Sequence, residues 1–171
     1  LSIRRQRQMC IRDRDRRIEK LMKQFEIVTE PIQTELYRDY TLNEHQGAVV
    51  VFTGHVREWT KGVRTKYLEY EAYTPMAEKK LAQIGDEIKQ RWPGTITTIV
   101  HRIGALQISD IAVLIAVSSP HRKDAYQANE YAIERIKEIV PIWKKEIWED
   151  GEEWQGHQKG THQEAKRGRT L

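Results

Sequence analysis

The chain has 171 residues, a length that fits one domain and buries enough surface to fold without disulfides. It contains a single cysteine, Cys10, which excludes a disulfide framework and a cysteine-based metal site. The longest apolar run, residues 111–117, is far shorter than the roughly 20 residues that a membrane-spanning helix needs. These features favour a globular, cytoplasmic domain.

The net charge of +4 is concentrated at the N-terminus. Residues 1–21 hold eight basic and three acidic side chains, whereas the remaining 150 residues hold 21 basic and 22 acidic ones. The rest of the chain is therefore not basic, and we expect neither a nucleic-acid nor a membrane partner. We interpret residues 1–21 as a basic leader foreign to the natural protein, with a disordered basic arm as the alternative.

We expect one folded domain over residues 22–158 and a polar tail over residues 159–171. The domain begins with a short strand that ends at Pro31 and a polar helical stretch over residues 33–44. The run GAVVVFT at residues 47–53 is continuously apolar, which predicts a strand buried on both faces. After a loop over residues 54–62, an aromatic-rich strand is predicted at residues 64–73.

Thr74 and Pro75 predict a helix start, with Thr74 as N-cap, and residues 92–94 predict its end. Strands follow at residues 95–101 and 110–118. Ser119 and Pro120 mark the start of a second helix that Pro141 ends. The apolar stripes of the two helices are Ala77, Leu81, Ile84 and Ile88 in the first, and Ala125, Ala128, Ala132, Ile136 and Val140 in the second.

The segment IWKKEIW, followed by EDG and EEW, predicts a hairpin that turns at Asp150 and Gly151. From residue 47 the order is then β-β-α-β-β-α-β-β with short links. This order predicts an α+β fold in which helices pack on a mainly antiparallel sheet.

The candidate site is cationic. No Gly-rich phosphate loop, cysteine nucleophile or metal-ligand pattern is present in residues 22–158, so we expect no cofactor and no metal. Arg57 follows the end of a strand, and His121 and Arg122 open a helix whose N–H groups favour an anion. Lys137 lies in the last turns of that helix, and Lys144 lies in the next strand. We expect these elements to converge on an anionic small molecule.

Each of these positions also has a structural interpretation. Arg57 is equally an ordinary loop cation, and His121 and Arg122 are equally polar residues of a solvated first turn. Lys137 is equally a surface lysine near Glu134 at a helix C-terminus. The residue types alone leave both interpretations open.

Five segments favour one of these interpretations: GAVVVFTGHVR, LEYEAYTPMAEKKL, IVHRIGALQISD, VSSPHRKDAYQANEYAIERIKEIVPIWKKE and DGEEW. In order and spacing they resemble the large, catalytic subunit of molybdopterin synthase, from about residue 24 to about residue 158. The combination of PHR, a helical lysine and WKKE is more specific than any single motif. The resemblance implies an α/β hammerhead-type fold and a dimer of large subunits. It also implies a small ubiquitin-like subunit at each end, which makes a heterotetramer.

The reaction implied by this resemblance is a sulfur transfer in molybdenum cofactor biosynthesis. Cyclic pyranopterin monophosphate (precursor Z) becomes molybdopterin when its dithiolene is formed. Two sulfur atoms come from the thiocarboxylate at the small subunit's C-terminal Gly-Gly. A sulfurtransferase without cysteine in residues 22–171 agrees with this chemistry, because its sulfur must arrive on another molecule.

The resemblance also implies site residues, of which Lys137 and Lys144 are the expected catalytic pair. The substrate-contacting positions are His55, Val56, Arg57, His121, Arg122, Lys137, Lys144, Lys145 and Glu146. Repulsion between two ammonium groups in one pocket would favour the neutral, proton-transferring form of a lysine. Position 55 is often lysine in the family. An arginine found near the C-terminus of some members is missing here unless Lys159 replaces it.

Two other classes of function compete with this interpretation. A β-β-α-β-β-α sheet is also typical of modules that bind RNA or small effectors, but these need a basic or aromatic sheet face. An inactive scaffold would keep the fold without keeping the cationic residues together. We therefore expect an enzyme.

Overall fold

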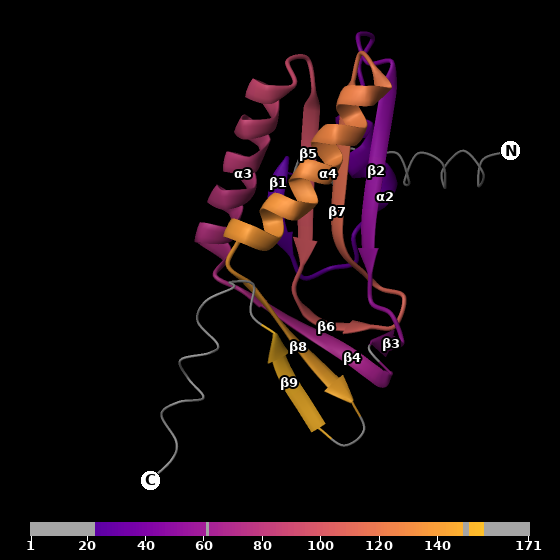
Figure 1. The fold of residues 1–171 in the computed structure, drawn as a ribbon, viewed down its shortest axis with the longest axis vertical. Helices are drawn as coiled ribbons and strands as arrows, with labels where there is room; N and C mark the ends of the chain where they lie inside the picture. The colour runs from indigo at the N-terminus through magenta and orange to yellow at the C-terminus, as the bar shows by residue number, and fades with distance from the viewer. Residues whose placement is uncertain (1–22, 61, 149–150, 156–171) are drawn as a thin grey trace, which may run out of the picture.

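The structure, a computed structural model, describes residues 23–60, 62–148 and 151–155. The predicted leader at 1–21, the tail at 159–171 and Lys159 lie outside the described residues. The elements are β1 (Phe25–Val28), α2 (Thr34–Tyr40), β2 (Ala48–His55), β3 (Trp59–Thr60), β4 (Val63–Ala72), α3 (Thr74–Arg91), β5 (Ile96–Arg102), β6 (Gly104–Gln107), β7 (Ile111–Ser119), α4 (Arg122–Ile139), β8 (Ile142–Trp148) and β9 (Gly151–Gln155) (Figure 1).

The described strands form two sheets, one above the other in Figure 1. The first has the order β1-β5-β7-β2 and is antiparallel except for the pair β1 and β5. The second has the order β3-β4-β8-β9, with β6 also paired to β4, and is antiparallel throughout. The predicted α+β class is thus confirmed, as is the hairpin of β8 and β9. The described strands divide into two sheets rather than one, because β4 pairs with β3, β6 and β8 and with no described strand of the first sheet.

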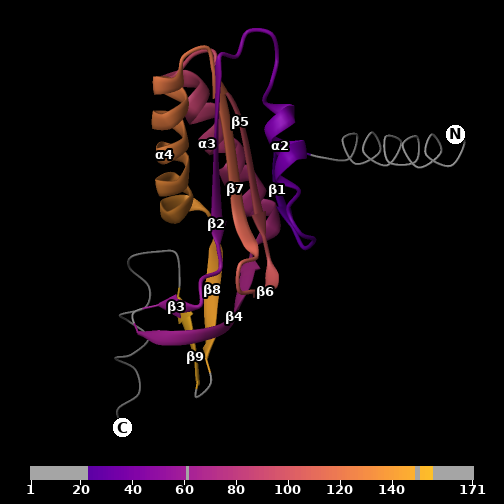
Figure 2. The same ribbon diagram turned by 90° about the vertical axis from the view of Figure 1, so that its right-hand side faces the viewer.

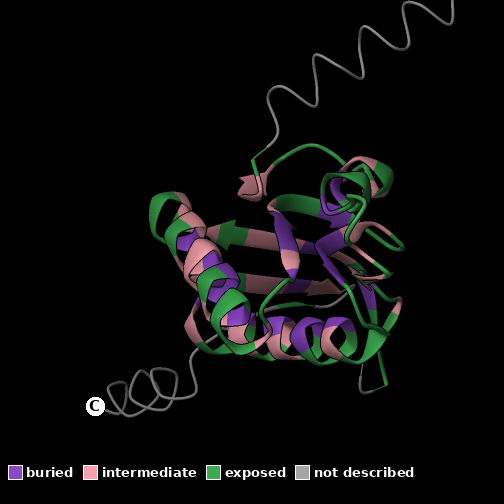
Figure 3. Cartoon of the chain, turned by 90° about the horizontal axis from the view of Figure 1, so that it is seen from above, coloured by how far each residue is buried: buried purple, intermediate pink, exposed green. Residues whose placement is uncertain are grey.

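Helices cover both faces of the first sheet (Figure 2). The two long helices, α3 and α4, pack on one face and α2 packs on the other. All nine residues of the predicted apolar stripes are buried, and Figure 3 shows the buried parts of both long helices turned inward. The main core lies between these stripes and the inward side chains of β5 and β7, such as Ile99 and Ile115.

The prediction that the strand at residues 47–53 is buried on both faces is wrong. This strand, β2, is at the edge of its sheet and pairs only with β7 among the described strands. Its residues are half-buried, and Phe52 is 37% exposed. The strands buried on both faces are β5 and β7, the two inner strands of this sheet. A continuous run of apolar, β-branched residues is typical of a strand buried on both faces. An edge strand can have the same composition when one of its faces lines a cleft, as β2 does here.

Helix starts differ from the predictions by one or two residues. The N-cap of α3 is Tyr73, so Thr74 is the first helical residue, and neither long helix has a side-chain capping bond. The N-cap of α4 is His121. Among the described residues, no helix is long and apolar enough to cross a membrane.

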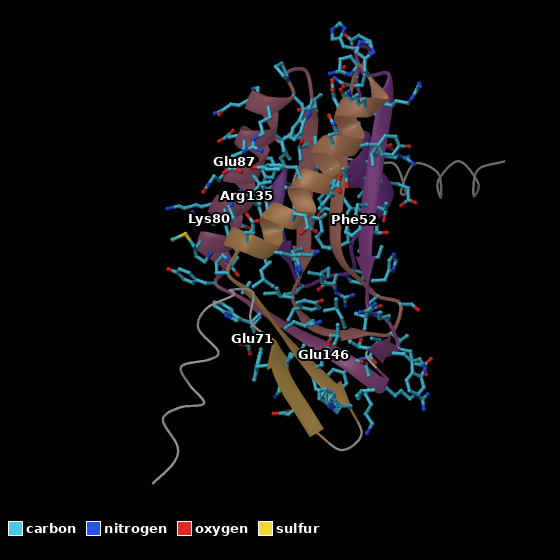
Figure 4. The ribbon with its side chains drawn as sticks, in the orientation of Figure 1. Phe52, Glu71, Lys80, Glu87, Arg135 and Glu146 are labelled. Carbon is cyan, nitrogen blue, oxygen red and sulfur yellow. The ribbon has the colours of Figure 1, made fainter. Side chains whose placement is uncertain are left out.

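A polar cluster joins α3 to α4 on their outer side (Figure 4). Arg135 Nε donates to Glu87 Oε2 at 3.0 Å, and the Tyr131 hydroxyl donates to the same oxygen. The hydrogen bond from Arg135 lowers the pKa of Glu87 to about 2. A carboxyl group whose pKa falls on folding stabilises the fold above its unfolded pKa, near 4.5, and loses this contribution as the pH falls towards 2.

We predict that Glu87→Gln lowers the free energy of unfolding by about 1 kcal/mol at neutral pH. The loss should shrink steadily below pH 4.5, where the wild-type carboxylate also becomes protonated. Urea unfolding of both proteins across this range measures the difference. The matched control is Glu58→Gln, because its partner Arg64 is exposed and the pair contributes little. An equal loss at neutral and at acidic pH would contradict the prediction.

Candidate active site

A cleft of about 370 Å³ lies where α4 and the first sheet meet the second sheet. We call it the lysine cleft. Its lining residues are Phe52, Gly54, Tyr70, His101, Val113, Ile133, Ile136, Lys137, Ile142 and Lys144. Six elements supply these residues: β2, β4, β5, β7, α4 and β8. All except β5 contribute apolar or aromatic side chains, and α4 and β8 each also contribute one lysine. The cleft is thus an apolar cavity with two ammonium groups.

Gly54 gives the cleft one of its walls. A Cβ atom at this position would lie 2.7 Å from Val113 Cγ1, which is closer than real Cβ contacts come. The register between β2 and β7 also shifts between Gly54 and His55, as in a β-bulge. A side chain at residue 54 would therefore force β2 away from β7 and change the shape of the cleft.

Lys137 and Lys144 both line the cleft, as predicted, but each has a carboxylate partner. Lys137 Nζ lies 2.9 Å from Glu134 Oε1, and Lys144 Nζ lies 2.7 Å from Glu146 Oε1. The expectation of two ammonium groups crowded together did not include these carboxylates, which the structure places beside each lysine.

The second sheet presents a polar face to the cleft. Tyr70 lies directly opposite Lys144, and Leu68 lies opposite Glu146, so all four side chains share one face of β4 and β8. Glu146 is buried, with 4% of its surface exposed (Figure 4). Burial, and secondarily the charge of Glu146, raise the pKa of Tyr70 to about 12. The Tyr70 phenol is therefore fixed in its protonated form.

Lys145 lies on the opposite face of β8, because neighbouring side chains of a strand alternate. Its ammonium group lies 2.7 Å from Glu152 Oε2 and 5.4 Å from the centre of the Trp154 ring. The hydrogen bond with Glu152 raises the pKa of Lys145. The structure thus brings Lys144 and Glu146 together and separates Lys145 from them.

The predicted residues 55–57, of which His55 ends β2, do not line the cleft. The His55 ring contacts Ser109 O at 2.9 Å and Thr53 Oγ1 at 3.0 Å. Val56 is 2% exposed, and its backbone N–H and C=O bond to Asp110 and Ser109. Val56 therefore has a packing role in this structure. Arg57 is exposed in the loop that follows.

His121 and Arg122 lie at the end of α4 opposite to the cleft. Arg122 begins the helix and Lys137 is in its last turn. Their Cα atoms are about 22 Å apart along the axis, at the usual rise of about 1.5 Å per residue. The expectation that both ends converge on one molecule is therefore wrong for a single chain. Fourteen helical residues lie between Arg122 and Lys137, so this separation follows from the sequence once the helix is placed.

Phe52, Tyr70 and His101 line the cleft but were not predicted as site residues. Phe52 and Gly54 face the cleft because they alternate with Thr53 along β2. Tyr70 and His101 come from different sheets, and their rings meet edge to face with centroids 5.0 Å apart. All three lie in segments that resemble the family, but their residue types alone do not indicate a site, because only the strand pairing brings them together. The described residues contain no group of three or more His, Cys, Asp or Glu side chains that could hold a metal ion.

We predict that Glu146→Gln lowers the pKa of Tyr70 from about 12 towards its ordinary value of 10. The shift should be partial, because burial is the larger cause and remains. Ultraviolet titration of tyrosinate, with Tyr70→Phe as the reference, measures it. Glu152→Gln is the matched control, since that carboxylate lies on the far face of the hairpin and should leave the titration unchanged. An unchanged titration in Glu146→Gln would show that the carboxylate does not act on this phenol.

Comparison with known proteins gives a consistent result. The family model described as MoaE protein matches residues 27–139. A molybdopterin synthase catalytic subunit from Staphylococcus aureus (strain COL) is 87% identical over 146 residues, which are 85% of this chain and 99% of the relative. A crystal structure of molybdopterin synthase from Staphylococcus aureus is 88% identical, with a TM-score of 0.78. It covers 80% of this chain and 99% of its own.

A more distant structure shares the fold. It is a complex of subunits 1 and 2 of the molybdopterin-converting factor from Helicobacter pylori 26695. The matched chain is 22% identical, with a TM-score of 0.64, and the match covers 76% of this chain and 88% of that one.

Proposed function

The chain belongs to the MoaE protein family, and we propose that it is the catalytic subunit of a molybdopterin synthase. In this proposal it converts cyclic pyranopterin monophosphate to molybdopterin in the cytoplasm, as a sulfurtransferase of molybdenum cofactor biosynthesis. The observation that carries the proposal is the lysine cleft, where Lys137 and Lys144 present cations in an apolar cavity.

The apolar walls and the two cations suit the proposed chemistry. A thiocarboxylate and a cyclic phosphate are both anionic, and two cations that line one cleft attract an anion between them. When sulfur leaves the thiocarboxylate, negative charge develops on the acyl oxygen. Lys137 and Lys144 would stabilise this charge and protonate oxygens that leave the pterin side chain. Glu134 and Glu146 form ion pairs with the two ammonium groups and position them.

The sulfur donor is a second protein in this proposal. The one cysteine of the chain, Cys10, lies outside the domain, so no thiol of the domain could carry sulfur. A small ubiquitin-like subunit would bring its C-terminal Gly-Gly thiocarboxylate into the lysine cleft. The Helicobacter pylori complex, which joins two subunits of a molybdopterin-converting factor, supports a partner subunit of this kind.

A second copy of the chain accounts for His121 and Arg122. These residues lie about 22 Å from Lys137 along α4, which is too far to contact the same small molecule. We propose a dimer of large subunits in which the His121 and Arg122 of one copy bind the phosphate near the lysine cleft of the other. Two small subunits would complete a heterotetramer.

We predict that Lys137→Ala abolishes product formation and leaves the fold intact, because the cleft loses one of its two cations. The experiment mixes the chain with a thiocarboxylated small subunit and cyclic pyranopterin monophosphate, and follows molybdopterin as its fluorescent oxidised derivative. Lys89→Ala, an exposed lysine in the last turn of α3, is the matched control and should keep full activity.

The outcomes of this reconstitution distinguish an active enzyme from an inactive scaffold. Product that disappears in Lys137→Ala supports the enzyme. Unaltered turnover by that variant overturns the assigned role of Lys137. A stable complex with the small subunit but no product from the wild-type chain supports the inactive scaffold.

We predict that mixed dimers of Arg122→Ala and Lys137→Ala regain activity. If each cleft takes Lys137 from one copy and Arg122 from the other, a mixed dimer has one intact and one doubly defective cleft. Random exchange then restores about a quarter of the wild-type activity, since about half of the dimers are mixed. The activity of the refolded mixture, compared with each variant alone, measures this. If the mixture recovers no activity, the two residues do not act in one cleft from different copies, and the proposed dimer arrangement is wrong.

A further inference from the structure

Tyr70 is a residue of the lysine cleft to which the proposed sulfur transfer gives no role. It lies on β4 and lines the cleft together with Lys137 and Lys144. Its ring meets the His101 ring edge to face, with centroids 5.0 Å apart, which holds it where the two sheets meet. Of the described residues that line the cleft, Tyr70 alone carries a hydroxyl group.

The hydroxyl group of Tyr70 is open to the cleft. It donates a hydrogen bond to no described residue, and Glu146 acts on it through charge. It is also not among the buried polar atoms that lack a partner, which are Gln46 Oε1, Thr97 Oγ1 and Thr98 Oγ1. Within the part of the chain that the structure describes, this O–H group is therefore available to a ligand.

Tyr70 and Lys144 form a pair of donors on one face of the second sheet. They lie directly opposite each other on β4 and β8, where the Cβ atoms of such a pair are about 5 Å apart. The pKa of Tyr70, raised to about 12, keeps the phenol protonated near neutrality. Lys144 directs one N–H group to Glu146 and has others to offer. One ligand oxygen can therefore accept hydrogen bonds from both residues.

The proposed reaction forms an oxygen anion that needs such donors. When the thiocarboxylate sulfur bonds to a pterin carbon, the acyl oxygen loses negative charge, and the carrier stays joined to the pterin through an acyl C–S bond. Water then adds to the acyl carbon, the electron pair of the C=O bond moves onto the oxygen, and one water proton goes to solvent. The C=O bond reforms as the C–S bond breaks with its electron pair on sulfur. The carrier leaves as a carboxylic acid, which gives its proton to solvent.

We propose that Tyr70 is a catalytic residue whose hydroxyl group donates a hydrogen bond to the acyl oxygen while water releases the spent sulfur carrier. This inference rests on the proposed function, since it assigns a step of the same reaction. The phenol and the Lys144 ammonium group bind the oxygen anion from neighbouring strands, which stabilises it relative to the neutral thioester. Tyr70 keeps its own proton throughout this step.

The test compares Tyr70→Phe with the wild-type full chain, each mixed with the thiocarboxylated carrier and the pterin substrate. The substitution removes the hydroxyl group and keeps the ring that contacts His101. We expect the adduct of carrier and pterin to form at the wild-type rate and its hydrolysis to slow about 100-fold. The adduct should therefore accumulate, which mass spectrometry of quenched single-turnover samples detects.

Tyr67→Phe is the matched control. It removes the same atom from the same strand, but Tyr67 lies opposite Ile147 and shares the far face of the sheet with Lys145. This variant should release the carrier at the wild-type rate. Urea unfolding checks the fold of both variants. Because the Tyr70 hydroxyl bonds to no described residue, its removal should not lower the unfolding midpoint.

The outcomes distinguish this inference from the proposed function. A wild-type chain that makes no molybdopterin overturns the proposed function, and the role of Tyr70 with it. Wild-type product together with adduct-free, normal turnover in Tyr70→Phe overturns the role of Tyr70 alone. A Tyr70→Phe variant that forms the adduct slowly, or that unfolds at a lower urea concentration, would show that the hydroxyl supports the shape of the cleft, which equally overturns its catalytic role.

Discussion

The position of α4 on the first sheet determines the rest of the site. Small side chains at Ala125, Ala128 and Ala132 let the helix lie close to the sheet. The buried Asn129 amide donates to Val50 O at 3.1 Å on β2 and to Ile115 O at 3.0 Å on β7. Because buried amides are costly without partners, these two bonds fix the helix along and around its axis.

The fixed position of α4 also determines where Lys137 and Lys144 lie. Pro141 follows α4, and β8 begins at Ile142, so the chain passes directly from the helix on the first sheet into the second sheet. Lys137 before this junction and Lys144 after it are seven residues apart and line one cleft. The pairing of β8 with β4 adds Tyr70 opposite Lys144. Because α4 and β8 are joined by only two residues, the cleft forms between them without a long loop to complete its walls.

Much of this architecture could be predicted from the sequence, because it depends on local periodicity. The stripes of α3 and α4 and the hairpin of β8 and β9 follow from spacing and turn residues. The edge position of β2 could not be predicted, since it depends on which strands pair. Lys145 shows the same limit within the site. The WKKE motif marks it, but strand alternation turns it away from Lys144 towards Glu152. His101 lies in the segment IVHRIGALQISD, but nothing in that segment predicts a place in the cleft, because His101 reaches the cleft only where the two sheets meet.

The two bonds of Asn129 have a consequence for what the cleft can bind. They join α4 to β2 and to β7 at once, so the helix and the two strands form one fixed wall of the cleft. A preorganised wall loses little conformational entropy when a ligand binds, which favours ligands that fit its shape.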